Sequence, residues 1–274
     1  MPTEALRKKA QQLDSEDPLA GFRSRFEWPQ PKGVPAIYFT GNSLGLMPTD
    51  ARKAIHEELD LWARFGVEGH FEGPHPWYSY HLDLKPGLAE LCGAMEEEVT
   101  PMASLTQNLH FLLANFYRPQ GKRTKILCEG SSFPSDFYML DSQVRWHNLS
   151  PEQEIIELHP RKGETHLRTQ DILDRVEGLG EELALVLMGG VNYLTGQRFQ
   201  MQEITEAGHR AGAIVGFDLA HAMGNVPLML HDWKVDFAAW CTYKYLNSGP
   251  GATAGLFVHK KHHGNTPYRL EGWW

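Results

Sequence analysis

Short apolar runs alternate with helical stretches along the second half of the chain. The runs include "TKILCEG" at 124–130, "LALVLMGG" at 183–190 and "AIVGFDLAH" at 213–221. Between them lie stretches with helical spacing, such as "TQDILDRVEGL" at 169–179 and "MQEITEAGHRAG" at 201–212. Apolar β runs interleaved with helices are typical of an α/β fold. We therefore predict a mostly parallel sheet with flanking helices.

Further segments extend this pattern. The segment "QEIIELHP" at 153–160 predicts a strand, and so do "VDFAAWCTYK" at 235–244 and "GATAGLFVHKK" at 251–261. The segment "FPSDFYMLDSQVRWH" at 133–147 predicts a helix that begins at Pro134 or Ser135. Together with the first group, these segments make the sheet large enough for a single α/β domain.

The first part of the chain is helical in pattern and contains no comparable strands. Apolar spacing predicts helices over 3–14, 49–65, 82–95 and 104–117, and Thr49 is a candidate N-cap. We expect a helical arm and lead-in segment over residues 1–40, followed by a large domain over residues 41–274.

Composition limits the classes of function. The chain has 274 residues and a formal net charge of -8, which argues against nonspecific binding to nucleic acids or anionic membranes. No run approaches the roughly 18 apolar residues that a membrane span needs, and we expect no signal peptide at the N-terminus. The three cysteines form no recognisable metal or disulfide framework. We therefore expect a cytoplasmic location.

Ligands of parallel sheets bind beyond the carboxyl ends of the strands, so the residues that end each run are candidates for function. Asp218 ends one run, with His221 just after it, and Tyr243 and Lys244 end another. A lysine at the end of a buried strand either pairs with another group or takes part in chemistry. Lys244 is therefore the first candidate.

Two helix starts supply complementary groups. "SLTQN" places Leu105 and Thr106 at a helix start, where backbone N–H groups can bind an anion. "FPSD" places Phe133 and Asp136 at another. Pyridoxal phosphate requires a lysine for its Schiff base, a carboxylate for its ring nitrogen and donors for its phosphate. The joint pattern favours such a site, with Lys244, Asp218 and the helix start in those roles.

Each of these residues also has a purely structural interpretation when it is taken alone. Lys244 would then be a solvated or ion-paired lysine, and Asp218 would cap a turn. His221 would be a structural histidine, Phe133 a core residue and Thr106 an N-cap. These alternatives stay open on spacing alone.

Several motifs together resemble the kynureninase family. They are "YFTGNSLGLMP", "SLTQNLHFLL", "FPSDFY", "VNYLTGQ", "FDLAHAMGN", "HDWKVDFAAWCTYKYLNSGPG" and "LEGWW", spread from about residue 36 to the end. The resemblance implies the large domain of the fold type I pyridoxal-phosphate enzymes. It also implies a hydrolase of carbon–carbon bonds that converts L-kynurenine or 3-hydroxy-L-kynurenine to anthranilate or 3-hydroxyanthranilate and L-alanine, in tryptophan catabolism and NAD biosynthesis.

The resemblance also assigns roles to residues. It implies covalent attachment of pyridoxal 5'-phosphate at Lys244, a partner for the ring nitrogen in Asp218, and a proton-transfer role for Tyr243. Substrate-side positions are implied at Ser43 and His70. The remaining cofactor contacts that it implies are Leu105, Thr106, Phe133, Asp136, His221, Tyr243 and Trp273. The family often has serine where Gly189 stands, so the role of that position stays open.

The resemblance implies two further properties. Kynureninases continue beyond the position of Trp274 into a small C-terminal domain with an arginine that binds the substrate's α-carboxylate, so we expect this chain to be C-terminally incomplete. Kynureninases are homodimers with the site at the interface, so we also expect a second copy as partner and a kynurenine-type small molecule as substrate.

Four alternatives remain. A cysteine desulfurase or class-V aminotransferase would share fold and cofactor, but a histidine typically precedes its lysine, where this chain has Tyr243. An inactive fragment could dimerise with a complete partner. A nucleotide-binding protein is not favoured, because no phosphate-binding glycine motif is present. A metal site at His259, His262 and His263 is less favoured than a solvated basic turn, because no carboxylate lies nearby in the sequence.

Overall fold

A computed structural model describes residues 3–264 and residue 270. The predicted sheet is present, with seven strands in the order β1-β7-β6-β5-β4-β2-β3. The strands are β1 (Val99–Pro101), β2 (Lys125–Glu129), β3 (Ile155–Leu158), β4 (Leu183–Gly189), β5 (Ile214–Asp218), β6 (Phe237–Trp240) and β7 (Gly255–Val258). Pairing is parallel from β3 through β6, and β7 runs antiparallel to both of its neighbours.

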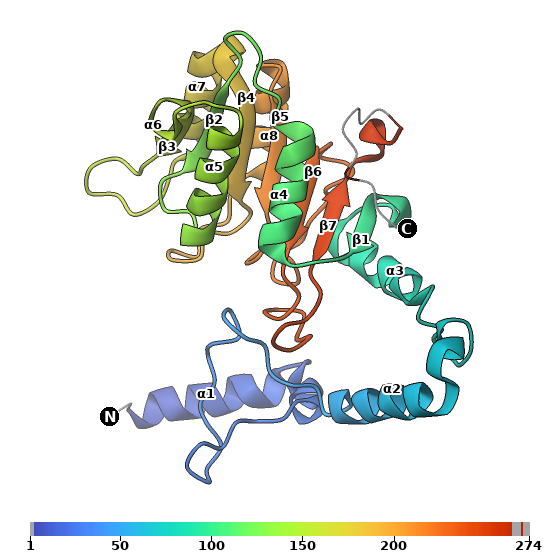
Figure 1. Cartoon of the computed structure of the whole chain (residues 1–274). Coiled ribbons are helices and arrows are strands. Elements are labelled where there is room, and N and C mark those ends of the chain that lie inside the picture. The colour runs from blue at the N-terminus through green and yellow to red at the C-terminus, as the bar shows by residue number, and fades with distance from the viewer. Residues whose placement is uncertain (1–2, 265–269, 271–274) are drawn as a thin grey trace.

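The longer helices that follow β1 cover both faces of the sheet, whereas the first two α-helices lie away from it (Figure 1). The α-helices are α1 (Glu4–Glu16), α2 (Ala51–Phe65), α3 (Tyr80–Cys92), α4 (Leu105–Phe116), α5 (Pro134–Trp146), α6 (Pro151–Glu154), α7 (Thr169–Leu179) and α8 (Met201–Arg210). Short 3-10 helices span Ala20–Arg25, Gly66–His70, Glu96–Glu98, Gly180–Glu182 and Lys260–His262. No helix within the described residues is both long and apolar enough to cross a membrane.

Two apolar clusters fill the two faces of the sheet. Successive strand residues point to opposite faces, so Ile126 and Cys128 pack with α4 and α5, whereas Leu127 packs with α7 and α8. The same alternation in β6 sends Phe237 to the first cluster and Trp240 to the second. A sheet covered on both sides explains why its strands are almost uniformly apolar in sequence.

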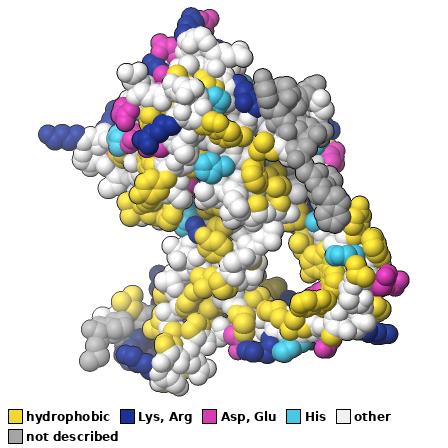
Figure 2. Space-filling model, viewed as in Figure 1, with side chains coloured by type: hydrophobic (Ala, Val, Ile, Leu, Met, Phe, Trp, Pro, Cys, Tyr) yellow, Lys and Arg dark blue, Asp and Glu magenta, His cyan; other side chains and the backbone are white. Residues whose placement is uncertain are grey.

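We call residues 99–264 the sheet body and residues 3–79, which precede α3, the N-terminal arm. In Figure 1 the arm extends away from the sheet and returns to it through α3. Among the described residues of the arm, Gly69 alone is buried. Figure 2 shows apolar side chains gathered over the lower part of the molecule, where Figure 1 places α2 and the lead-in segment.

Several predicted boundaries were wrong for local reasons. Asp50, not Thr49, is the N-cap of α2, and its side chain makes no capping hydrogen bond; Thr49 lies one residue outside, where its N–H donates to the Arg25 carbonyl. The helix predicted over 82–95 ends at Cys92, because Gly93 adopts a left-handed conformation with φ 61°. The edge strand β1 was missed, because its three residues take their β form from pairing with β7.

Candidate active site

A cavity of about 460 Å³ opens at the carboxyl ends of the central strands. The strand ends contribute Glu129 from β2, Gly189 from β4 and Asp218 from β5. The remaining lining residues come from loops and helix starts: Asn42, Ser43, Ser104, Leu105, Thr106, Phe133, Ser135, Asp136, Val191, Tyr193, Ala220, His221, Tyr243 and Lys244. Most of the predicted site residues thus gather in one cavity at the edge of the sheet that the rule for parallel sheets indicated, and their roles stay predictions.

The sequence predicted Lys244 at the end of a strand, but the residue lies in the loop after β6. The strand ends at Trp240, because the chain then turns back toward β7 through a hydrogen bond from Thr242 Oγ1 to the Thr253 carbonyl, 2.7 Å. The Lys244 side chain nevertheless points inward and is buried. Its Nζ lies 5.8 Å from the centroid of the Phe133 ring, so the ring borders the ammonium group.

His221 is the hydrogen-bond partner of this lysine. Lys244 Nζ donates to His221 Nε2 at 2.8 Å. Burial, with a smaller effect from the Lys244 charge, lowers the pKa of His221 to about 4. The imidazole is therefore neutral at pH 7 and has a free lone pair to accept this bond.

Two carboxyl groups share a proton on the other side of the cavity. Asp218 ends β5, and Asp136 projects from the first turn of α5; the two side chains are hydrogen-bonded to each other. Burial raises the pKa of Asp136 well above its usual range, and the Asp218 charge raises it further. Burial raises the pKa of Asp218 as well, so the pair favours holding a proton between its two carboxyl groups. Asp218 Oδ1 also accepts the Ala220 N–H at 2.7 Å.

The start of α4 borders the same cavity. Ser104 caps the helix: its hydroxyl accepts the Gln107 N–H at 3.4 Å, and Gln107 Oε1 accepts the Ser104 N–H at 3.1 Å. This capping box uses the third helical N–H, so the N–H groups of Leu105 and Thr106 have no acceptor within the helix. Such a helix start attracts an anion.

The segment around Ser43 closes the cavity from the arm side. The Gly45 N–H donates to the Tyr243 carbonyl at 2.8 Å, and Asn247 Nδ2 donates to the Leu46 carbonyl at 2.9 Å.

Burial raises the pKa of the Tyr243 hydroxyl to about 12, with further contributions from Cys241. Tyr243 therefore keeps its proton at neutral pH and can donate it.

The family follows from the comparison with known proteins. The sequence model of the family "Aminotransferase class-V" matches residues 85–272, more than half of the chain.

The chain belongs to the aminotransferase class-V family.

Curated relatives within this family confirm the resemblance to kynureninases. The chain is 55% identical to a kynureninase of Flavobacterium psychrophilum over 97% of its own length and 63% of that protein. It is 52% identical to a kynureninase of Christiangramia forsetii, over 100% of its own length and 65% of that protein. A kynureninase of Dictyostelium discoideum is 47% identical. The chain thus spans somewhat less than two thirds of the length of these relatives.

Solved structures share the fold at low identity. A cystine C–S lyase in complex with cysteine persulfide aligns with a TM-score of 0.71 and 21% identity, covering 86% of this chain and 60% of that one. A cysteine desulfurase from Thermococcus onnurineus aligns with a TM-score of 0.68 and 17% identity, covering 96% of this chain and 60% of that one. These likenesses confirm the predicted fold class and do not separate one class-V activity from another.

Among the described residues, one predicted site residue, His70, does not line this cavity. His70 ends the 3-10 helix Gly66–His70 in the arm, where its ring packs edge-on against Phe71 and Trp77 at 6.2 and 5.5 Å. It is absent from the residues that line the cavity, so its substrate role stays a prediction. Trp273 lies outside the described residues.

The sequence analysis missed several lining residues. Glu129 ends β2 as Asp218 ends β5, so the strand-end rule that selected Asp218 should have selected Glu129 as well. Tyr193 gave no such signal, because it lies in a loop. Its ring contacts Phe133 edge-on, with centroids 5.2 Å apart.

The histidine-rich turn after β7 also differs from expectation. The predicted solvated turn is present, since Lys260, Lys261 and His263 are exposed. The expectation that no carboxylate lies nearby is wrong, because Glu98 and Asp236 lie against the turn from distant parts of the chain. Asp236 Oδ1 lies 2.7 Å from Lys261 Nζ and 2.8 Å from His262 Nε2. The turn is thus fastened to the sheet body through buried carboxylates.

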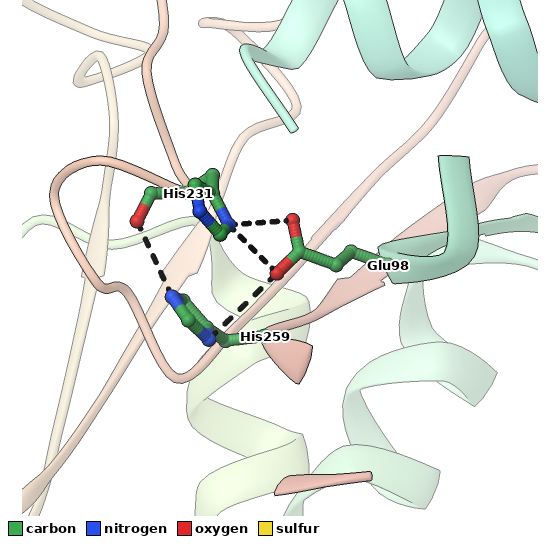
Figure 3. A group of neighbouring side chains, drawn as sticks. All are labelled: Glu98, His231 and His259. Atoms are coloured by element: carbon green, nitrogen blue, oxygen red, sulfur yellow. Dashed lines mark hydrogen bonds and ion pairs between the residues drawn. The ribbon is translucent and has the colours of Figure 1, made fainter. Parts of the chain in front are cut away.

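Glu98, His231 and His259 form a close group beside this turn (Figure 3). Glu98 Oε1 accepts hydrogen bonds from His231 Nδ1 and from the Lys260 N–H, each at 2.9 Å. His259 Nδ1 accepts the Lys261 N–H at 3.1 Å, and His259 Nε2 faces the His231 carbonyl at 3.3 Å. The two rings stack 15° from parallel, so their in-plane lone pairs do not converge on one point. Hydrogen bonding accounts for this group without an ion.

Proposed function

We propose that this chain is the cofactor-binding part of a kynureninase, which uses pyridoxal 5'-phosphate to hydrolyse L-kynurenine or 3-hydroxy-L-kynurenine to anthranilate or 3-hydroxyanthranilate and L-alanine. The observation that carries the proposal is the buried Lys244 in a cavity at the strand ends, with a neutral histidine at its Nζ. Identity of about 50% to kynureninases along nearly the whole chain supports the substrate class.

The residues present fit the cofactor. Asp218 offers a carboxylate for the ring nitrogen, the start of α4 offers N–H groups for the phosphate, and Phe133 offers an apolar face. Lys244 would hold the cofactor covalently through Nζ, as the family resemblance implies. When bound, pyridoxal phosphate withdraws electrons from the Cα of an attached amino acid and so makes its Cα proton removable.

The protein's own groups then move protons and orient the reactants. Once the substrate amine has replaced Lys244 on the cofactor, the freed Nζ would take the proton from the substrate Cα. His221 orients Nζ by accepting its hydrogen bond and adds no positive charge beside it, because its pKa is lowered to about 4. Tyr243 keeps its proton to about pH 12 and donates it to the oxygen of the substrate's γ-carbonyl group. This donation assists the addition of water to the γ-carbon, which precedes the breaking of the Cβ–Cγ bond.

We also propose that the chain acts as a cytoplasmic homodimer. The three cysteines are free and buried, which suits a reducing compartment. The arm exposes Ile37 and Phe39 at 86% and 88% and carries an apolar face on α2, so a second copy would cover apolar surface there. The proposed domain boundary is the one predicted from the sequence: residues 1–40 are the helical lead-in, and residues 41–274, which include α2, belong to the large domain.

The test is an absorbance spectrum of the chain with added pyridoxal phosphate, before and after borohydride reduction. We expect a visible band that borohydride removes and that Lys244→Ala lacks, whereas Lys122→Ala, an exposed lysine beside Glu181, keeps it. Kynurenine turnover by the loaded chain should fall by at least about 100- to 10,000-fold in Lys244→Ala. A wild-type chain without the band would contradict cofactor binding by this chain.

A reducible band without kynurenine turnover would separate the two halves of the proposal. It would support the cofactor site and reject kynureninase activity for the chain on its own. Turnover of cysteine in place of kynurenine would instead favour the desulfurase alternative.

A further inference from the structure

Glu129 is a buried carboxylate that the proposed mechanism does not use. It ends β2, is 3% exposed and lines the cavity. Each of its oxygens accepts one hydrogen bond from an uncharged donor: Oε1 from the Gly189 N–H at 3.1 Å and Oε2 from Asn192 Nδ2 at 2.8 Å. Burying an acidic side chain against neutral partners is costly, so its retention calls for a reason.

Asn192, the partner of Glu129, is itself 3% exposed and fully engaged. Its Oδ1 accepts the N–H groups of Leu194 and Thr195, both at 2.9 Å, and so closes the turn after β4. Its Nδ2 also lies 3.0 Å from Ser131 Oγ, in the loop after β2. The pair Glu129–Asn192 therefore joins two loops that are distant in the sequence.

Each of these two loops contributes one aromatic side chain to the lining of the cavity, Phe133 after β2 and Tyr193 after β4. Phe133 follows Ser131 and borders Lys244, whereas Tyr193 follows Asn192 and lies 6.4 Å from the His221 ring. The two aromatic rings meet edge-on at 5.2 Å. A change in the loop after β2 would move Phe133 away from Lys244, and a change in the loop after β4 would move Tyr193 away from Phe133 and His221.

We propose that Glu129 is a positioning residue, which together with Asn192 fixes the loops after β2 and β4 and thereby sets Phe133 against Lys244 and Tyr193 against His221. Its contribution to the cofactor site rests on the proposed function, whereas the joining of the loops does not.

The donor pattern explains why this position needs a carboxylate. Both partners are donors, so both side-chain oxygens must accept, and a glutamine would turn an NH₂ group toward one of the donors. The same contact bears on the glycine at position 189. A Cβ there would lie 2.7 Å from Glu129 Oε1, so any side chain at this position would require the carboxylate oxygen to shift.

The first experiment measures hydrogen–deuterium exchange of the chain without cofactor, in wild type, Glu129→Gln, Asn192→Asp and the double variant. In Glu129→Gln an NH₂ group faces an N–H or NH₂ donor, and in Asn192→Asp two carboxylates face each other. In the double variant the amide at position 129 can donate to the carboxylate at position 192, so one donor again faces one acceptor. We expect exchange in both segments 130–136 and 190–196 to rise about tenfold in the single variants and to return toward wild type in the double variant. Segment 201–210 should not change.

Three results would overturn the proposal: a rise in only one of the two loops, a uniform rise across the sheet body, or a double variant no better protected than the single ones. Glu157→Gln is the matched control, because Glu157 lies on the neighbouring strand β3 and does not line the cavity.

The second experiment measures half-saturation by pyridoxal phosphate and the circular dichroism of the bound cofactor. We expect Glu129→Gln to raise the half-saturating concentration about tenfold and to reduce the dichroic signal, with recovery in the double variant. Increased loop exchange with unchanged cofactor binding would contradict the positioning role. If the wild-type chain binds no cofactor, the proposed function fails, while the exchange experiment still decides whether Glu129 joins the loops.

Discussion

The sheet body buries most of its large apolar side chains, whereas the N-terminal arm leaves many of its own exposed. The body encloses two apolar clusters between its sheet and its helices, with most of the large side chains fully buried. The arm has helices of similar length but buries only Gly69 among its described residues. The body is therefore stabilised from within, whereas the arm needs a surface beyond its own to cover its apolar face.

A pair of helices shows the same contrast at smaller scale. Helix α4 buries Leu109, Leu113 and Phe116 against the sheet. Helix α2 has apolar residues at matching intervals, but Ile55, Leu59 and Trp62 are 50% to 64% exposed. Equal helical pattern thus leads to unequal burial, because only α4 lies beside a sheet.

The largest expected effect compares one phenylalanine from each region. Phe237→Ala should lower the free energy of unfolding by about 3–5 kcal/mol, because the ring is fully buried and stacks on Phe116 at 5.0 Å. Phe39→Ala, at a ring 88% exposed, should change it by less than about 0.5 kcal/mol in the monomer. Denaturant unfolding measures both, and equal losses would remove the contrast between body and arm.

The second effect concerns the joint between the two regions. A Cβ at Gly45 would lie 2.3 Å from the Lys244 carbonyl oxygen, so Gly45→Ala must displace the loop that carries Tyr243 and Lys244. We expect cofactor affinity to fall by about tenfold, in line with an overpacking cost of about 1–3 kcal/mol. A titration of pyridoxal phosphate tests this.

Gly41→Ala is the matched control for that joint, since a Cβ at position 41 meets nothing within 4 Å. Equal affinity of the two variants would show that the arm does not influence the site.

The third effect concerns Asp236, which holds the histidine-rich turn after β7 against the sheet body. Burial raises the pKa of Asp236, but hydrogen bonds from His209, His262 and Lys261 outweigh burial and lower it overall. Asp236→Asn should therefore lower the free energy of unfolding at pH 7 by about 1–3 kcal/mol.

The pH dependence of that loss has a definite sign. A lowered pKa contributes stability above the unfolded-state value of about 3.9 and loses it as the pH falls below that value. The difference between the parent and Asp236→Asn should thus shrink below about pH 4. Unfolding curves from pH 7 to pH 3 measure it, with exposed Asp232→Asn as control. A constant difference across this range would contradict the charge-based account.

The smallest effect on the isolated chain belongs to α2. Trp62→Ala should change monomer stability by less than about 0.5 kcal/mol, because the side chain is 64% exposed. If a second copy covers this face, the same change should weaken dimerisation by about 1 kcal/mol or more, as for a buried aromatic at an interface. Light scattering over a dilution series measures it, with Lys53→Ala on the same helix for comparison. Unchanged dimerisation would exclude this face from the interface.

Much of the body and its site could be predicted from the sequence. The alternation of apolar runs and helices predicted six of the seven strands, and the strand-end rule brought Asp218, His221, Tyr243 and Lys244 to one edge. These predictions hold because a buried strand needs continuous apolar sequence and because parallel strands end at the same edge. The seventh strand, β1, is three residues long and depends on its neighbour.

Other features depend on contacts that no local pattern contains. The carboxylates beside the histidine turn come from Glu98 and Asp236, and the loops of the cavity are joined by Glu129 and Asn192 across 63 positions. Whether α2 or α4 is buried depends on what lies beside each helix.

The sequence by itself determined the α/β class, the order of most elements and the edge at which the chemistry lies, because periodicity and strand direction are local properties. Only the tertiary structure decided which carboxylates meet, that Asp136 shares a proton with Asp218, and that Lys244 faces a neutral His221. Those outcomes depend on burial and on distances between groups far apart in the chain, and both exist only once the chain has folded.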